Sequence, residues 1–259
     1  MKIEKILNIQ DRKEEFQTAK PFPFLVIDDF LSPEDAEAVQ NDFPKMDDER
    51  LFVYKNPLED KVALNDWNVF PSATYQLLQY LNSNEVVEQL SALADLELSS
   101  DQGLHGGGWH MHGPGGKLNP HLDYSIHPKL GRQRKLNLIL YMGKDWQEEW
   151  GGHLGFWSND PEKNKPAELL QETAPKFNRA VIFDTTKQSW HGITQYISCP
   201  PGHMRKSLAV YYLCEPLPGA SERERALYAP TKDQEGDDKI LKLIKDRADA
   251  SNYKKVYKT

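Results

Sequence analysis

The sequence has few cysteines and lacks long apolar runs. Its 259 residues include only Cys199 and Cys214, which cannot form a disulfide framework or a cysteine-based zinc site. No stretch approaches the roughly 18 consecutive apolar residues that a membrane helix needs. Residues 1–16 carry scattered charges where a signal peptide has an apolar block. We therefore expect a cytoplasmic chain with no membrane partner.

Glycine is absent from residues 1–102, and all 16 glycines lie from Gly103 onward. All eight histidines lie between His105 and His203. Residues 1–102 carry 9 basic and 21 acidic residues, whereas the rest of the chain carries 23 and 18. Because phosphate contacts need basic surface, the acidic first part argues against a nucleic-acid partner. Since glycine permits tight turns and histidine supplies metal ligands, we expect the chemistry after residue 102.

Residues 1–102 are predicted to form one strand and a layer of helices. The apolar run 24–27 is typical of a short strand. Ser32, followed by proline and two acidic residues, is a typical helix start, and this helix should end near Pro44. Apolar residues three to four positions apart predict two more helices at 72–81 and 84–94.

From Gly103 the pattern changes to short apolar runs separated by Gly, Pro and Asn clusters. These runs predict strands at 136–141, 152–157, 179–183 and 207–213. Many short strands at this spacing indicate an antiparallel sandwich or barrel. Residues 219–259 return to helix, with 238–247 as the best candidate. The chain from Lys239 onward carries seven basic and two acidic residues, which is typical of a solvated helix face, with nucleic-acid binding as the alternative.

Three residues have the spacing of a metal site. His121 and Asp123 are two positions apart, so on a strand or at its end both side chains point to the same side. His191 follows Asp123 by 68 residues, after the apolar run 179–183. Two histidines and one carboxylate on one face of an ion form the facial triad of non-haem Fe(II) oxygenases. A surface turn pair and a core histidine are the alternative interpretations.

A basic residue and a hydroxyl follow at the start of the last apolar strand. Arg205 and Ser207 are two apart, 14 and 16 residues beyond His191, and so share a face. An arginine binds a carboxylate bidentately, and a hydroxyl can add a hydrogen bond. A metal beside this pair suits a dicarboxylate that chelates the ion at one end. An ordinary charge at a strand edge is the alternative for Arg205.

The order His-x-Asp, His, Arg-x-Ser resembles the prolyl 4-hydroxylase-like branch of the 2-oxoglutarate and Fe(II)-dependent dioxygenases. The resemblance covers residues 103–214 and includes Gly151-Gly152 and Lys144-Asp145-Trp146. It implies a mainly β fold, the double-stranded β-helix of jelly-roll or cupin type. We expect a single oxygenase domain over 1–259, built from an N-terminal strand and supporting helices (1–102), the catalytic core (103–218) and a C-terminal helical extension (219–259).

The resemblance also implies the ligands. His121, Asp123 and His191 would bind Fe(II), and Arg205, with Ser207, would pair with the distal carboxylate of the cosubstrate 2-oxoglutarate. Tyr141 falls where the family has a tyrosine that hydrogen-bonds this carboxylate, although barrel core is an alternative. The gap from His191 to Arg205 is longer than usual in the family, and a turn at 199–202 would absorb it. O₂ is the second cosubstrate, and L-ascorbate is a candidate reductant.

Further residues are candidates for the pocket wall. Asn137 shares a strand face with Tyr141, so both pocket lining and a structural hydrogen bond stay open. The substrate-pocket candidates are His110, His112, Trp157 and Trp190. His127, His153 and His203 are expected on loops or at the surface. The loops expected to choose the substrate are 124–135 and 158–178.

These residues predict a hydroxylase that acts on an unactivated C–H bond and converts 2-oxoglutarate to succinate and CO₂. The sequence has no paired-carboxylate or Ser-His-Asp constellation, so no catalytic residue beyond the metal ligands is expected. Peptidyl or free proline is the first substrate hypothesis, followed by other small molecules. The alternative is an inactive jelly-roll protein that binds a metal or a sugar. A zinc hydrolase is disfavoured because no His-Glu-x-x-His motif occurs.

Overall fold

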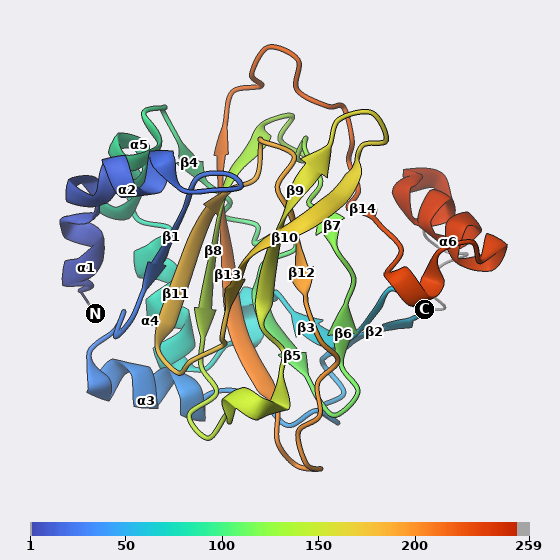
Figure 1. Cartoon of the computed structure of the whole chain (residues 1–259). Coiled ribbons are helices and arrows are strands. Elements are labelled where there is room, and N and C mark those ends of the chain that lie inside the picture. Colours follow the sequence, from blue (N-terminus) through green and yellow to red (C-terminus); the bar gives the residue numbers. More distant parts are fainter. Residues whose placement is uncertain (1, 253–259) are drawn as a thin grey trace.

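Two antiparallel sheets face each other in the computed structural model, which describes residues 2–252 (Figure 1). The larger sheet contains β1 (Phe24–Ile27), β2 (Phe52–Asn56), β3 (Glu59–Leu64), β4 (Ser99–Ser100), β5 (Gly108–His112), β6 (Lys117–Leu118), β8 (Gln133–Tyr141), β11 (Arg179–Asp184) and β13 (Arg205–Cys214). The smaller sheet contains β7 (His121–Leu122), β9 (Leu154–Asp160), β10 (Lys165–Thr173), β12 (Trp190–Ile193) and β14 (Leu227–Tyr228).

The strand orders are β1-β11-β8-β13-β5-β3-β2 in the larger sheet and β10-β9-β12-β7-β14 in the smaller one. Strand β4 pairs with β13 and β6 pairs with β3, off the main path of the larger sheet. Strands distant in sequence are therefore neighbours, as the crossing connections of a jelly roll require. The predicted fold, mainly β with a curled two-sheet core and supporting helices, is confirmed.

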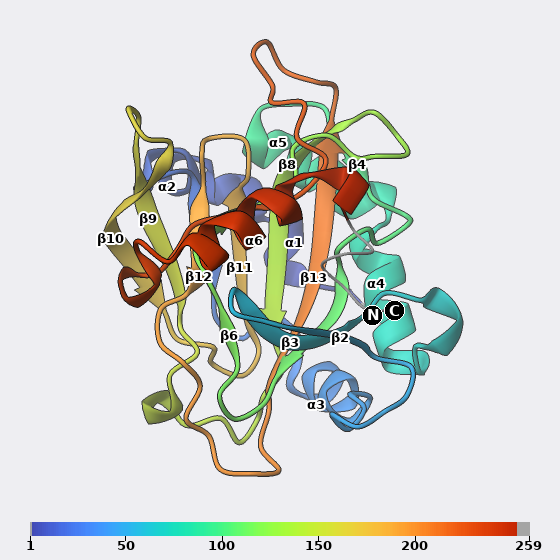
Figure 2. The same cartoon turned by 90° about the vertical axis from the view of Figure 1, so that its right-hand side faces the viewer.

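The helices lie outside the two sheets. They are α1 (Glu4–Leu7), α2 (Lys13–Thr18), α3 (Pro33–Asn41), α4 (Ser72–Leu81), α5 (Asn84–Ala94) and α6 (Asp238–Ala248), with 3₁₀ turns η1 (Ile9–Arg12), η2 (Trp67–Val69), η3 (Glu148–Trp150), η4 (Lys232–Gln234) and η5 (Ala250–Asn252). Helices α1 to α5 cover the larger sheet, and α6 lies on the opposite side of the molecule, in front of the strands in Figure 2. No helix of the described chain is both long and apolar enough to cross a membrane.

The helix boundaries follow local signals in the sequence. The Ser32 hydroxyl accepts a hydrogen bond from the backbone N–H of Asp35 (3.1 Å) and so caps α3, which ends at Asn41, before Pro44. Helices α4 and α5 coincide with the predicted ranges because their apolar residues recur at helical spacing. Helix α6 also begins at the predicted residue, whereas residues 253–259 of the basic tail lie outside the described residues.

Side chains on the central strand β8 alternate between two faces of the sheet, one that packs in the core and one that faces the site. On β8, the side chains of Leu136, Leu138 and Leu140 pack against the helices. The alternate residues Asn137 and Tyr141 point into the space between the sheets, where they are also buried. The helical layer thus fixes the outer face of the larger sheet, and this leaves the inner face for polar groups.

Two segments differ from the prediction. The glycine-free region contributes the hairpin β2–β3 to the larger sheet, with Phe52 paired to Ala63. An aromatic and β-branched run before the Asn56-Pro57 turn was the available signal for this hairpin. Residues 158–178, expected as a loop, mostly continue β9 and β10 as a hairpin, because their ladder extends to the pair Lys165–Asp160.

Replacing a side chain between the helices and the larger sheet should destabilise the fold. Leu140→Ala empties a fully buried position on β8, so we expect the free energy of unfolding to fall by about 2–5 kcal/mol. Leu169→Ala on β10, where the side chain is 38% exposed, is the control and should cost under about 1 kcal/mol. Urea unfolding measures both, and equal effects would contradict the assignment of the core.

Candidate functional site

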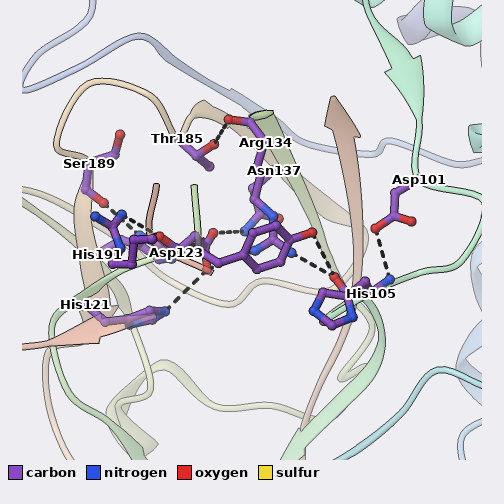
Figure 3. A network of polar contacts seen from close by, with 12 residues as sticks. Asp101, His105, His121, Asp123, Arg134, Asn137, Thr185, Ser189 and His191 are labelled. Atoms are coloured by element: carbon purple, nitrogen blue, oxygen red, sulfur yellow. Dashed lines mark hydrogen bonds and ion pairs between the residues drawn. The ribbon is translucent and has the colours of Figure 1, made fainter. Parts of the chain in front are cut away.

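The smaller sheet brings two distant histidines together. His121 on β7 pairs with His191 on β12 in the antiparallel ladder, and their ring centroids are 4.2 Å apart. Asp123 follows two residues after His121, directly beyond β7. His121 Nε2 lies 3.8 Å from Asp123 Oδ1, and His191 Nε2 lies 3.7 Å from Asp123 Oδ2. Figure 3 shows the three side chains pointing toward one another.

Backbone carbonyls orient both imidazoles. His121 Nδ1 lies 3.0 Å from the Asn119 carbonyl oxygen, and His191 Nδ1 lies 2.8 Å from that of Ser189. A carbonyl only accepts, so each Nδ1 carries the proton and donates it. The unprotonated Nε2 of each ring is therefore left to face Asp123, which is the arrangement that metal-binding histidines adopt.

Asp123 stays ionised in spite of its burial. Burial raises the pKa of Asp123, but the Arg134 guanidinium and the two histidines lower it to about 2. Arg134 Nη1 lies 3.3 Å from Asp123 Oδ1, and the guanidinium is held between the rings of Tyr124 (3.4 Å) and Tyr211 (3.3 Å). Asn137 Nδ2 donates to Asp123 Oδ2 at 3.4 Å. The carboxylate thus has a fixed orientation and a fixed charge.

The histidines are neutral at physiological pH. Burial lowers the pKa of His121 to about 3 and also lowers that of His191. Neutral imidazoles and an ionised carboxylate are the forms that bind a metal, so the site needs no proton release before binding. The ligand atoms of His121, Asp123 and His191 all lie within 4.8 Å of one another. Two nitrogens and one oxygen in this compact set fit Fe(II).

A buried cation lies in the same cavity. Arg205, on β13, donates through Nε to the Gly152 carbonyl oxygen (2.7 Å) and through Nη2 to the Tyr141 hydroxyl (3.2 Å). Within residues 2–252, no carboxylate forms an ion pair with Arg205. A Cβ at Gly152, where φ is +72°, would lie 2.9 Å from Arg205 Cδ, so glycine is required beside this side chain. A buried guanidinium without a counter-ion fits a ligand carboxylate.

The cavity between the sheets contains most of the predicted site. Of the predicted residues, it is lined by His110, His112, His121, Asp123, Asn137, His191, Arg205 and Ser207. Tyr141 is buried behind it and reaches Arg205 through its hydroxyl. His112 is 2% exposed, and neither of its ring nitrogens has a hydrogen-bond partner, so the ring offers both to a ligand.

The two tryptophans do not line this cavity. Trp190 alternates with His191 and so faces the other side of β12, where it packs on Leu122 and donates to Asn159 Oδ1 (2.8 Å). Trp157, its partner in the ladder, lies on the same side. His127, expected at the surface, is 3% exposed, with its Nδ1 accepting from the backbone N–H groups of residues 129 and 130.

Several residues of the cavity wall were not predicted from the sequence. Lys61 comes from the unpredicted hairpin, and Tyr228 comes from β14, where its ring stacks on His121 at 5.0 Å. Arg247, on α6, also lines the cavity. Lys61 is the nearest of these residues to Asp123, which it precedes by 62 positions. None of the three belongs to a local motif, so no spacing in the sequence indicated that they lie near the site. Arg134 is closer to Asp123 in the sequence. Whether its side chain lies on the inner face of β8 depends on the exact register between β8 and β13, which the sequence does not specify.

Comparisons with known proteins agree with this geometry. Residues 107–213 match the family model of the 2OG-Fe(II) oxygenase superfamily. A 65-residue stretch, 25% of this chain, is 28% identical to the mouse prolyl 3-hydroxylase OGFOD1, but it spans only 12% of that protein. The match over residues 107–213 agrees with the predicted family, and the His-Asp-His cluster fits the predicted Fe(II).

Several solved structures have similar folds. A Pseudomonas putida prolyl-4-hydroxylase aligns over 82% of this chain and 100% of its own, with a TM-score of 0.55 and 17% identity. A Trichoplax adhaerens prolyl hydroxylase in complex with a peptide of hypoxia-inducible factor aligns over 81% of this chain and 91% of its own, with a TM-score of 0.53 and 14% identity. HygX from Streptomyces hygroscopicus, with nickel, 2-oxoglutarate and hygromycin B bound, aligns over 79% of this chain and 86% of its own, with a TM-score of 0.51 and 13% identity. At these identities the likeness concerns the fold.

A small residue beside His191 keeps the two histidine strands together. A Cβ at Gly192 would lie 2.8 Å from the carbonyl oxygens of both Leu118 and Asn119. We therefore expect Gly192→Ala to push β12 away from β7 and to weaken metal binding about 10–100-fold. Gly113→Ala, whose Cβ would meet only the flexible Met46 side chain at 3.5 Å, is the control. Calorimetric titration with Mn(II) measures both, and unchanged affinity in Gly192→Ala would argue against the tight strand pairing.

Proposed function

Because residues 107–213 belong to the 2OG-Fe(II) oxygenase superfamily, we propose that this enzyme hydroxylates an unactivated C–H bond of its substrate. One O₂ and one 2-oxoglutarate are consumed for each C–H bond converted to C–OH, with succinate and CO₂ as the co-products. The observation that carries the proposal is that the His121–Asp123–His191 cluster and Arg205 open on one cavity. That combination provides for a metal and for a dicarboxylate side by side.

Each residue of the site has a proposed role. His121, Asp123 and His191 hold Fe(II), which supplies the activation of O₂ when it is bound. Arg205 binds the distal carboxylate of 2-oxoglutarate with the help of the Tyr141 hydroxyl. Ser207, two residues along β13 on the same face, lines the cavity beside Arg205. Its hydroxyl, which donates to the His110 carbonyl oxygen at 3.4 Å, would turn to the ligand carboxylate. This clamp directs the 2-oxo acid end of the cosubstrate toward the three ligands.

The surrounding residues keep the charge of the site constant. Arg134 and Asn137 hold the Asp123 carboxylate toward the histidines, and the tyrosine rings on either side of Arg134 keep its guanidinium from turning away. The ligands are buried, so water has little access to the bound groups. Exclusion of water protects a reactive oxidant from side reactions.

Proline, in a peptide or free, is the proposed substrate. Support comes from the relatives: the Pseudomonas and Trichoplax proteins are prolyl hydroxylases, and the latter was solved with a peptide. HygX, solved with hygromycin B, makes other small molecules the second class to test. A succinate-release screen with proline peptides, free amino acids and sugars, with L-ascorbate as reductant, tests the proposal directly. Release stimulated only by non-proline compounds would exclude proline as the substrate.

Loss of the carboxylate ligand should remove both metal binding and turnover. Asp123→Ala deletes the only anionic ligand of the cluster, so we expect Mn(II) affinity to fall by more than about 100-fold and succinate release to disappear. Asp145→Ala, at an exposed position, is the control and should behave as the wild type. A folded Asp123→Ala protein that still releases succinate would disprove the metal assignment.

Loss of the buried cation should affect 2-oxoglutarate but not the metal. Arg205→Met removes the charge that binds the distal carboxylate, so we expect the 2-oxoglutarate Kd to rise on the order of 100-fold while Mn(II) affinity is retained. Lys206→Met, on the same strand and facing the outer side near Phe43, is the control.

Anaerobic calorimetry of both variants gives the Kd values for 2-oxoglutarate and for Mn(II). An unchanged 2-oxoglutarate Kd in Arg205→Met would contradict the assignment of Arg205 to the distal carboxylate. Binding of 2-oxoglutarate by the wild type without any turnover would favour the alternative, a protein of this fold that only binds.

A further inference from the structure

The cavity has a second cationic region on the side formed by β3. Lys61 lines the cavity, and its side chain is 12% exposed. The register that pairs Val62 with Met111 sets Lys61 beside His112, which in turn pairs with Arg205 on β13. Neighbouring strands are about 5 Å apart, so Lys61 and Arg205 begin about 10 Å from each other on one row of the sheet.

Among residues 2–252, no carboxylate lies within hydrogen-bond distance of the Lys61 ammonium group. Lys61 Nζ lies 3.7 Å from Glu59 Oε2, which is longer than a hydrogen bond. Glu59 is fully buried and already accepts from the Tyr228 hydroxyl (2.9 Å) and from Arg247 Nε (3.0 Å). Glu59 is therefore shared between two cations of the described chain, Lys61 and Arg247. Burial lowers the pKa of Lys61 even though Glu59 raises it, as expected for a cation that lacks a full counter-charge.

The cosubstrate does not require this lysine. In the proposed function, Arg205 with Tyr141 binds one end of 2-oxoglutarate, and the metal ligands direct the other end. Asp123, the carboxylate nearest the metal position, is held by Arg134. The ammonium group of Lys61 lies 5.1 Å from the centre of the Tyr54 ring and 3.7 Å from Glu59. It is thus left on the cavity wall with donors that no described residue engages at hydrogen-bond distance.

We propose that Lys61 binds a carboxylate of the substrate and so selects acidic substrates for this site. The proposal rests on the proposed function and adds a substrate class to it. A substrate carboxylate would complete the pairing that Glu59 provides in part, since a buried ammonium is stable only with a counter-charge. Arg247 and Tyr228 hold Glu59 away from a full ion pair with Lys61 and so keep the ammonium available.

Binding of matched acid and amide probes tests this inference. The enzyme is loaded with Mn(II) and 2-oxoglutarate without O₂ and titrated with L-proline against L-prolinamide, and with blocked prolyl-aspartate and prolyl-glutamate against their asparagine and glutamine counterparts. We expect the wild type to bind at least one acid about 10- to 100-fold more tightly than its amide. Lys61→Met should abolish this preference and Lys61→Arg should keep part of it, with 2-oxoglutarate affinity within about twofold of wild type in both.

Lys55→Met is the matched control, because Lys55 lies exposed on the neighbouring strand β2 and the variant loses the same charge outside the cavity. Absence of any acid preference in the wild type, absence of binding by every probe, or a preference that survives in Lys61→Met would each overturn the inference. A weaker 2-oxoglutarate affinity in Lys61→Met would do the same by assigning the lysine to the cosubstrate. Failure of the wild type and of Lys55→Met to bind 2-oxoglutarate would instead overturn the proposed function itself.

Discussion

The pairing of β7 with β12 is the constraint on which the rest of the site depends. It sets His121 opposite His191, and the chain then needs only two more residues to bring Asp123 to the same point. Everything around this pairing preserves it: the carbonyls of Asn119 and Ser189 orient the rings, and the absence of a side chain at residue 192 lets the strands approach. A metal centre built on paired strands has little freedom to distort.

The site also depends on the different roles of the two faces of the larger sheet. Leucines on the outer face of β8 pack against the helices of the N-terminal layer, and polar residues on the inner face line the cavity. Because side chains alternate along β8 from Leu136 to Tyr141, Asn137 and Tyr141 are placed by the same packing that stabilises the domain. The acidic, glycine-free segment therefore supports the site, and its hairpin also supplies one wall.

Much of this could be predicted from the sequence because the signals are local. Ser32 marks a helix start, and the two amphipathic helices have the correct spacing. The order and spacing of His121, Asp123, His191 and Arg205 indicated a shared site, because the family resemblance supplied the topology. The residues that were missed depend on tertiary structure alone. Lys61 and Tyr228 reach the cavity through strand pairings that no local pattern specifies, and Trp190 faces away from it because it alternates with a ligand.

The position of β3 near the end of the sheet path has an evolutionary consequence. The groups proposed for metal and cosubstrate lie on or directly after β7 and on β8, β12 and β13, whereas Lys61 lies on a strand whose outer neighbour is the edge strand β2. A mutation on β3 leaves the ladders between β8, β13 and β11 intact. Substitutions at Lys61 can therefore change the proposed substrate contact while the residues proposed for metal and cosubstrate are inherited unaltered.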